Sequence, residues 1–296
     1  MTRREKMSRI NDYLDFLAKH GRADKTIKDY RLKLTEAEKA LEAGGFPTDP
    51  RETDGDAFLY LRTHLGGKEA TVRQIMKAWD RLVEWDTGRK VLPTLGLLWN
   101  RNQVRRTFIS PAEYRRMMDA ARDPFERIVL VLGGMMGCRR VEMLRLRMED
   151  IRTDSVMLHG KGHQDGLIIA QPINGTVQAE IGAYTAWRAR LPGSSAENRF
   201  LLLPSSRGGF IGESTMEYMI PRTIKALARR AGVEASTHTL RRLFGTTIYN
   251  ATDHDLATTA RLLRHADIGT TVQCYIEPSQ NRDMEALNAM CQALSL

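Results

Sequence analysis

Along the first third of the chain, apolar residues recur three and four positions apart, the spacing of one face of an α-helix. In one such stretch Ile75, Trp79 and Leu82 form an apolar stripe, whereas Arg73 and Lys77 lie on another face. The periodicity predicts four helices, at about 5–20, 24–43, 54–66 and 69–86. We therefore expect a helical unit whose basic side is either solvated or lies along a phosphate backbone.

The helical pattern stops at a stretch without acidic residues, 87–112. This stretch contains Pro93 and Gly96, which interrupt regular structure. Three arginines stand near its end: Arg101, Arg105 and Arg106. Such a segment is either a solvated connection or one that follows DNA. We predict domains at 1–95 and 107–296, joined by a basic interdomain linker at 96–106.

The remainder of the chain returns to helical patterns with one exception. Ser110 followed by Pro111 is typical of a helix start. Periodicity predicts helices at about 110–121, 124–136, 139–147, 174–190, 213–232, 238–250, 255–264 and 270–277. Residues 154–172 instead show two short apolar segments around a polar, glycine-rich turn, which predicts a β-hairpin. The expected fold is mainly α, of the α+β type, with a small antiparallel β-hairpin sheet.

Charge and composition narrow the class of protein. The net charge of +9 and the isoelectric point near 9.6 fit either a polyanionic partner, usually nucleic acid, or a soluble basic protein. Three cysteines without a CxxC pair or zinc-binding spacing argue for a reducing compartment. The start lacks a signal-peptide core, and the longest apolar run, 128–138, is too short to span a membrane. We expect a soluble cytoplasmic protein, associated with the nucleoid.

One predicted helix start brings two cationic side chains together. In STHTLRRLFG, Ser236 or Thr237 can cap the helix, and His238 and Arg241 lie three positions apart on one face. A histidine and an arginine near the electropositive end of a helix suit an anion, most simply a phosphate.

Other polar residues of this half stand out, although each alone has an ordinary interpretation. Arg139 and Glu142 can form a helix salt bridge, and Lys161 can be a solvated turn lysine. His265 follows a helix end, where a charged imidazole is stabilised, and Tyr275 is one of eight tyrosines. The candidate set, in chain order, is Arg139, Lys161, His238, Arg241, His265 and Tyr275.

In this order the set resembles the catalytic signature of the tyrosine recombinases, the phage-integrase family. The resemblance lies in four strings of the second half: GCRRVEML, GKG, HTLRR and LLRHADIGTTVQCY. Two strings of the first half, KTIKDY and TVRQIMKAWDRLVEW, look like threonine-led helices of the family's SAM-like helical core-binding domain. The likeness extends over nearly the whole chain and is strongest over residues 130–277.

The sequence departs from the family's pattern in three places. Met136 stands in place of a common threonine, and Arg264 in place of the usual glycine before His265. Ile276 and Glu277 replace a frequent pair that ends in histidine. None of these changes removes a catalytic group, and together they suggest a divergent branch, such as an archaeal or viral one.

The resemblance implies that Tyr275 attacks a DNA phosphate, which yields a 3′-phosphotyrosyl link and a free 5′ hydroxyl group. Arg139 and Arg241 would bind the non-bridging oxygens, because a guanidinium group is always charged and is shaped for bidentate contacts. Glu142 would support them. No metal ion, nucleotide or other cofactor is implied.

The other three catalytic residues would move protons. His238 and His265 would share proton transfer and phosphate binding, and the residues leave open which of the two is the general base. Lys161 would protonate the leaving 5′ oxygen, which requires a pKa lowered by cationic neighbours.

The resemblance also implies the partners. These are double-stranded DNA with a specific recombination site and a tetramer on that DNA, which exchanges strands through a Holliday junction in integration, excision or resolution. The apolar tail at 280–296 can dock on a neighbouring protomer or pack on its own domain. Candidate DNA-binding residues are Lys25, Lys28, Arg73, Lys77, Arg101, Arg105, Arg106, Arg140 and Arg242.

Three other classes of function share parts of this pattern. A type IB topoisomerase would use a similar pocket without site specificity. A DNA-binding protein of this fold would keep the basic domains and lack a catalytic group. A metal-dependent hydrolase could use His159, His163 and His238, although the first two lie in a turn without a nearby pair of carboxylates.

Overall fold

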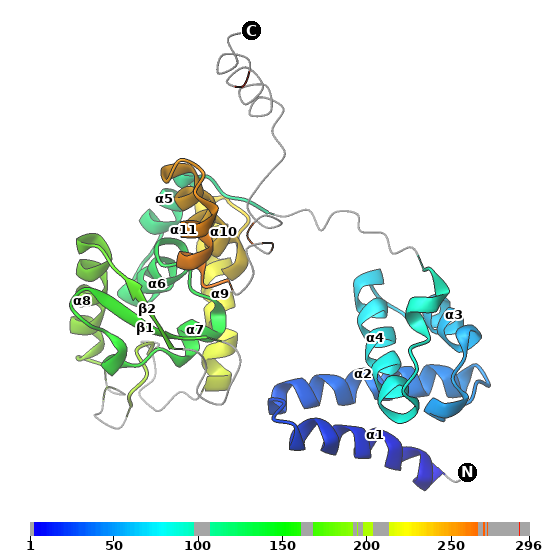
Figure 1. Cartoon of the computed structure of the whole chain (residues 1–296). Coiled ribbons are helices and arrows are strands. Elements are labelled where there is room, and N and C mark those ends of the chain that lie inside the picture. Colours follow the sequence, from blue (N-terminus) through cyan, green and yellow to red (C-terminus); the bar gives the residue numbers. More distant parts are fainter. Residues whose placement is uncertain are drawn as a thin grey trace. The chain divides into compact units, whose positions relative to one another are not determined.

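The chain divides into two compact units, Met1–Val104 and Arg105–Leu296 (Figure 1). The division falls within the predicted linker at 96–106, whose arginines lie outside the described residues. The computed structural model describes residues 3–97, 107–160, 168–191, 194, 198–203, 213–265, 269, 271 and 290, and no side chain of 3–8 or 213–215.

The first unit packs its helices around the apolar stripe seen in the sequence. Its elements are α1 (Arg3–Lys19), α2 (Asp24–Ala43), η1 (Pro50–Glu52), α3 (Gly55–His64), α4 (Glu69–Thr87) and η2 (Leu92–Leu95). Trp79 and Leu82 of α4 are fully buried, as the helical periodicity predicted. The buried carboxylate of Asp80 accepts hydrogen bonds from the backbone N–H groups of Val91 and Leu92, which holds η2 against the unit.

The second unit is mainly helical with a small sheet. Its elements are α5 (Pro111–Asp119), α6 (Pro124–Leu130), η3 (Val131–Met135), α7 (Arg140–Arg145), η4 (Met148–Asp150), β1 (Ser155–His159), β2 (Ile168–Pro172), α8 (Gly175–Arg188), α9 (Glu213–Ala231), α10 (Thr237–Ala251) and α11 (Leu256–Leu263). Strands β1 and β2 are antiparallel, with Ser155 opposite Pro172 and His159 opposite Ile168. This confirms the predicted mainly helical fold with a small hairpin sheet.

Glycines shape the segment between α6 and α7. The predicted helix 124–136 is not uniform, because α6 continues into the π-helical turn η3. A Cβ atom on Gly133 would lie 2.8 Å from Cδ1 of Leu240, and one on Gly137 would lie 2.4 Å from Cδ1 of Phe244. Gly137 also has a φ of +60°, which favours glycine. These glycines allow α10 to approach η3 and the loop before α7 closely.

Side-chain caps set the helix starts that the sequence indicated. Ser110 caps α5 in a reciprocal capping box with Glu113. The hydroxyl group of Ser236 accepts a hydrogen bond from the backbone N–H of Thr239 and so starts α10. The predicted helix 270–277 and the tail 280–296 lie outside the described residues, apart from positions 271 and 290. Within the described part of the chain, no helix is long and apolar enough to cross a membrane.

Candidate active site

A buried carboxylate stands at the centre of three arginines in the second unit. Glu142 of α7 is fully buried, and its Oε1 lies 2.7 Å from Nη1 of Arg139. Its Oε2 lies 2.9 Å from Nη2 of Arg264 and 3.8 Å from Nη1 of Arg241. These four residues are called the arginine cluster below. Three chain segments meet here: the start of α7, the second turn of α10 and the end of α11.

Local structure explains how Arg139 and Glu142 meet. Arg139 is the residue immediately before α7, and its backbone N–H donates a hydrogen bond of 2.8 Å to Oε2 of Glu142. A carboxylate three residues into a helix commonly satisfies this unpaired donor. Nη2 of Arg139 donates a hydrogen bond of 3.0 Å to the backbone carbonyl of Arg264. The side chain of Arg139 keeps 27% of its surface exposed, so it reaches from the buried carboxylate to solvent.

Arg241 is held mainly by backbone carbonyl groups. Its Nη1 donates to the carbonyl of Gly137, and its Nη2 donates to the carbonyl of Leu263 at the end of α11. The last carbonyls of a helix have no partner within the helix, so a guanidinium group is well placed to satisfy one. The side chain is only 5% exposed. Its guanidinium group is therefore fixed in the cluster.

The cluster keeps Glu142 ionised. Burial alone would raise the pKa of this carboxyl group. The charge of Arg264, together with the hydrogen bonds from Arg139 and Arg264, outweighs burial and lowers the pKa below its ordinary value. The neighbouring Cys138 is fully buried, and burial raises the pKa of its thiol to about 12. Cys138 is therefore a protonated packing residue and not a nucleophile.

His265 comes directly after Arg264 in the chain. Its Nδ1 lies 2.8 Å from Oγ1 of Thr271, a fully buried residue that fixes the ring. Burial lowers the pKa of His265 to about 4, and the positive charges of Arg241 and Arg139 add to this effect. At neutral pH the imidazole is neutral, so it can accept a proton or a hydrogen bond.

The charge of the cluster suits an anion. Among the described residues, its ion pairs set three guanidinium groups against the single carboxylate of Glu142. Buried charge is costly unless it is compensated, and planar guanidinium groups match phosphate oxygens in pairs. A phosphate group beside Arg139 would supply the missing negative charge. The arrangement can therefore hold a phosphodiester and stabilise added charge on it.

The structure brings together four of the sequence-predicted site residues: Arg139, Glu142, Arg241 and His265. His238 lies exposed in the first turn of α10, one turn before Arg241. Lys161 and Tyr275 lie outside the described residues. The roles of all these residues stay predictions.

The candidate DNA-binding residues fall into different environments. Lys25, Lys28 and Lys77 are exposed, and Arg73 is half-buried. Arg140 forms an ion pair of 3.1 Å with Glu217 of α9. The guanidinium group of Arg242 donates to the carbonyl of Thr107 and lies over the ring of Phe108. Both arginines therefore make contacts within the second unit. Their role in DNA binding stays a prediction, as does the role of Arg101, Arg105 and Arg106.

The histidines of the metal-hydrolase alternative do not form a ligand set in the described chain. His159 contacts Asp150 through Nε2 at 3.0 Å, which ties β1 to η4. His163 lies outside the described residues. Where side chains are described, no group of three histidine, cysteine or acidic residues is arranged to hold a metal ion.

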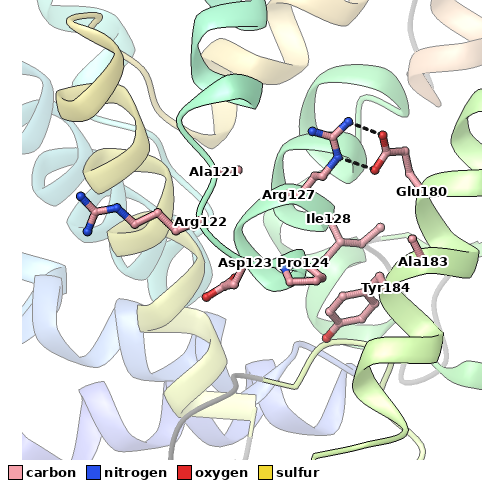
Figure 2. Close-up of a pocket in the computed structure, with 9 residues that line it drawn as sticks. All are labelled: Ala121, Arg122, Asp123, Pro124, Arg127, Ile128, Glu180, Ala183 and Tyr184. Carbon is pink, nitrogen blue, oxygen red and sulfur yellow. Dashed lines mark hydrogen bonds and ion pairs between the residues drawn. The ribbon is translucent and has the colours of Figure 1, made fainter.

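A cavity of about 260 Å³ lies elsewhere, between α6 and α8 (Figure 2). Its polar groups make structural interactions. Arg127 forms a bidentate ion pair with Glu180, and Asp123 caps α6. The hydroxyl group of Tyr184 donates to the carbonyl of Leu203, and burial raises its pKa well above the ordinary value. This cavity holds no activated nucleophile, so the arginine cluster is the better candidate site.

Sequence reasoning missed three residues at the site. Arg264 attracted notice only as a departure from the usual glycine, and Gln171 and Thr271 attracted none. Gln171 of β2 accepts a hydrogen bond from Arg264, and Thr271 contacts His265. One signal was present for Arg264. A cationic residue at a helix end where glycine is normal indicates that its side chain makes a specific interaction.

Residues 107–282 match the sequence pattern of the phage integrase family. The matched range is more than half of the chain and contains the whole arginine cluster. Two curated relatives are similar along nearly their full length. Tyrosine recombinase XerD of Brucella abortus is 28% identical, covering 95% of this chain and 96% of the relative. Tyrosine recombinase XerA of Pyrococcus furiosus is 27% identical, with 94% and 92% covered.

Solved structures share the fold. A lambda integrase dimer bound to a COC′ core site superposes with a TM-score of 0.66 at 16% identity, covering 93% of this chain and 98% of that one. A lambda integrase tetramer bound to a Holliday junction gives a TM-score of 0.69 at 15% identity, covering 93% and 79%. At these identities the likeness establishes the mainly helical fold with its small sheet.

Proposed function

The chain belongs to the phage integrase family and is a tyrosine recombinase, and from this premise we propose how it cleaves and rejoins DNA at a specific site. The observation that supports the proposal most is the buried Glu142 surrounded by three guanidinium groups. We place the scissile phosphate against Arg139, the most exposed arginine of this cluster. Arg241 shares the phosphate from the other side of the carboxylate.

The chemistry proposed for this pocket is phosphoryl transfer to a tyrosine. The phenol of Tyr275 attacks the phosphorus, the bond to the 5′ oxygen breaks, and a 3′-phosphotyrosyl link forms. Arg139 and Arg241 stabilise the charge that develops on the non-bridging oxygens. His265, neutral at neutral pH, accepts a proton or hydrogen bond in this step, and Lys161 protonates the leaving oxygen. No metal ion or nucleotide enters this sequence of steps.

The same proposal covers the partners. The first unit is proposed as a core-binding domain that contacts double-stranded DNA, and the second as the catalytic domain. Four protomers would act on two recombination sites through a Holliday junction, and the tail at 280–296 is a candidate contact between them. An enzyme with this substrate works where the DNA is, so we assign it to the cytoplasm, with the nucleoid.

A covalent-adduct assay tests the proposal. The substrate is a supercoiled plasmid that carries the DNA flanking this gene, incubated with the protein in EDTA and without ATP. We expect relaxed products and an SDS-resistant protein–DNA adduct that maps to Tyr275 and is absent in Tyr275→Phe. A scrambled insert of equal length is the control for site specificity.

Each other result points to a different function. An adduct that survives Tyr275→Phe contradicts the assignment of the nucleophile. Equal relaxation of the scrambled plasmid indicates a topoisomerase-like activity, and dependence on a divalent ion indicates a metal-dependent hydrolase. DNA that is bound and never joined to the protein indicates a binding protein of this fold.

A further inference from the structure

Arg264 occupies a backbone conformation that is unusual for its residue type. It follows the last residue of α11 with a φ of +56° and a ψ of +45°, in the left-handed region that favours glycine. An arginine here strains the backbone, whereas a glycine would not. A strained residue that persists at a candidate site indicates that its side chain is used.

The side chain of Arg264 is 2% exposed and touches three separate parts of the second unit. Its Nη2 donates to Oε2 of Glu142 and to the carbonyl of Gly137, each at 2.9 Å. Its Nη1 donates to Oε1 of Gln171 on β2 and to the carbonyl of Leu262. Because its side chain is almost completely buried, Arg264 is poorly placed to contact DNA itself.

Arg264 is the nearer of the two arginines at Oε2 of Glu142. It lies 2.9 Å from Oε2 of Glu142, whereas Arg241 lies 3.8 Å from the same oxygen. Its own backbone carbonyl accepts the hydrogen bond from Nη2 of Arg139. Without the Arg264 side chain, Oε2 would lose its nearest cation, and the Gly137 carbonyl that also accepts from Arg241 would lose one of its two donors.

We infer that Arg264 is a positioning residue: it holds Glu142 and the Gly137 carbonyl so that Arg139 and Arg241 stay oriented toward a phosphate. The inference rests on the proposed function of this site and deepens it. It also explains the presence of arginine where glycine would fit the backbone better. Through Gln171, the same side chain fastens the hairpin sheet to the cluster.

Three variants separate positioning from folding. Arg264→Gly removes the guanidinium group and keeps the left-handed backbone, and Arg264→Lys keeps the charge with fewer contacts. Arg261→Ala is the matched control, because it removes an exposed arginine from the same helix end. The three measurements are the single-turnover rate of adduct formation on the plasmid substrate, the DNA dissociation constant, and thermal unfolding.

We expect Arg264→Gly to form the adduct about 100-fold more slowly, since small misplacements of catalytic groups have effects of this order. Its DNA affinity should stay within about twofold of wild type, because many other phosphate contacts contribute. Arg264→Lys should recover a substantial part of the rate, and Arg261→Ala should match wild type. Unfolding should stay cooperative in all three variants.

Several outcomes would overturn the inference. A wild-type rate in Arg264→Gly would make the side chain a packing residue. A rate loss that comes with loss of cooperative unfolding, or an Arg264→Lys variant no faster than Arg264→Gly, would mean that fold or shape matters and not the position of the charge.

A second arm uses the DNA-free protein and inorganic phosphate, followed through the imidazole signals of His265. We expect phosphate to bind wild type at least about tenfold more tightly than Arg264→Gly, because two guanidinium groups held in a matching orientation bind an anion better than two misaligned ones. Equal affinities would contradict the inference. If wild type forms no adduct at all, the proposed function fails, and this arm still decides whether Arg264 positions the cluster.

Discussion

Glu142 and Arg264 are 122 positions apart in the chain, yet Oε2 of the first lies 2.9 Å from Nη2 of the second. This ion pair joins the start of α7 to the end of α11 with almost no solvent exposure on either side chain. Because Glu142 also bonds Arg139, which reaches solvent, the buried pair is linked directly to the surface where a phosphate would bind. A substitution that breaks this ion pair is therefore expected to change both the stability of the fold and the position of Arg139.

Replacing Glu142 with alanine should destabilise the protein strongly. The change leaves buried guanidinium groups without their carboxylate, and breaking a buried ion pair typically costs about 3–5 kcal/mol. Urea unfolding followed by circular dichroism measures the loss. The control is Glu180→Ala, which removes the partner of Arg127 from a more exposed pair and should cost about 1 kcal/mol or less. Equal losses for the two variants would contradict the central role of Glu142.

Gly137→Ala should destabilise the fold more than Gly232→Ala. Both glycines have left-handed backbones, with φ of +60° and +66°. Only at Gly137 would the new Cβ atom meet another residue, 2.4 Å from Cδ1 of Phe244. Overpacking should therefore add about 1–3 kcal/mol to a shared strain of roughly 1 kcal/mol. Thermal unfolding compares the variants, and similar losses would mean that α10 can move away without cost.

His265 should titrate far below an ordinary histidine in the DNA-free protein. Its pKa is about 4, against 6.5 in the unfolded chain, because burial and the arginine charges disfavour the protonated ring. The unfolded chain thus binds this proton first as the pH falls, so the folded state loses stability between about pH 6.5 and 4. NMR titration of the imidazole signals measures the pKa. A pKa near 6.5 for His265 would mean that the ring is not buried beside the arginines.

Arg139→Ala and Arg241→Ala should separate cleavage from binding. Each variant removes one guanidinium group from the phosphate, so adduct formation should fall by at least about 100-fold. DNA affinity should remain close to wild type, since many basic side chains share the contacts. Equal loss of cleavage and affinity would mean that these arginines serve binding. Arg241→Lys should not restore activity, because one ammonium group cannot reproduce two donors to separate carbonyls.

The affinity of wild type for DNA should fall steeply with salt. Each neutralised phosphate releases counterions, so the logarithm of the binding constant declines linearly with the logarithm of salt concentration. Fluorescence anisotropy over a series of salt concentrations gives the slope. A flat dependence would argue against a DNA backbone as the partner.

The sequence alone determined the features that depend on neighbours in the chain. Helical periodicity located the buried stripe at Trp79 and Leu82, and the glycine-rich turn at 154–172 indicated the hairpin. The three-residue spacing of Arg139 and Glu142 already predicted their ion pair. Hydrogen bonds within one turn, helix caps and alternating polarity each involve residues a few positions apart, so their pattern can be recognised in the sequence.

Only the tertiary structure decided what surrounds the carboxylate. Arg139 bonds the carbonyl of Arg264 across 125 positions, and Arg241 reaches the carbonyl of Gly137 across 104. The depressed pKa of His265 likewise depends on burial and on arginines contributed by distant segments. Burial and electrostatic fields arise when separate segments pack together, and no local spacing encodes them. For this reason Arg264 was a simple departure in the sequence and became a partner of Glu142 only in the fold.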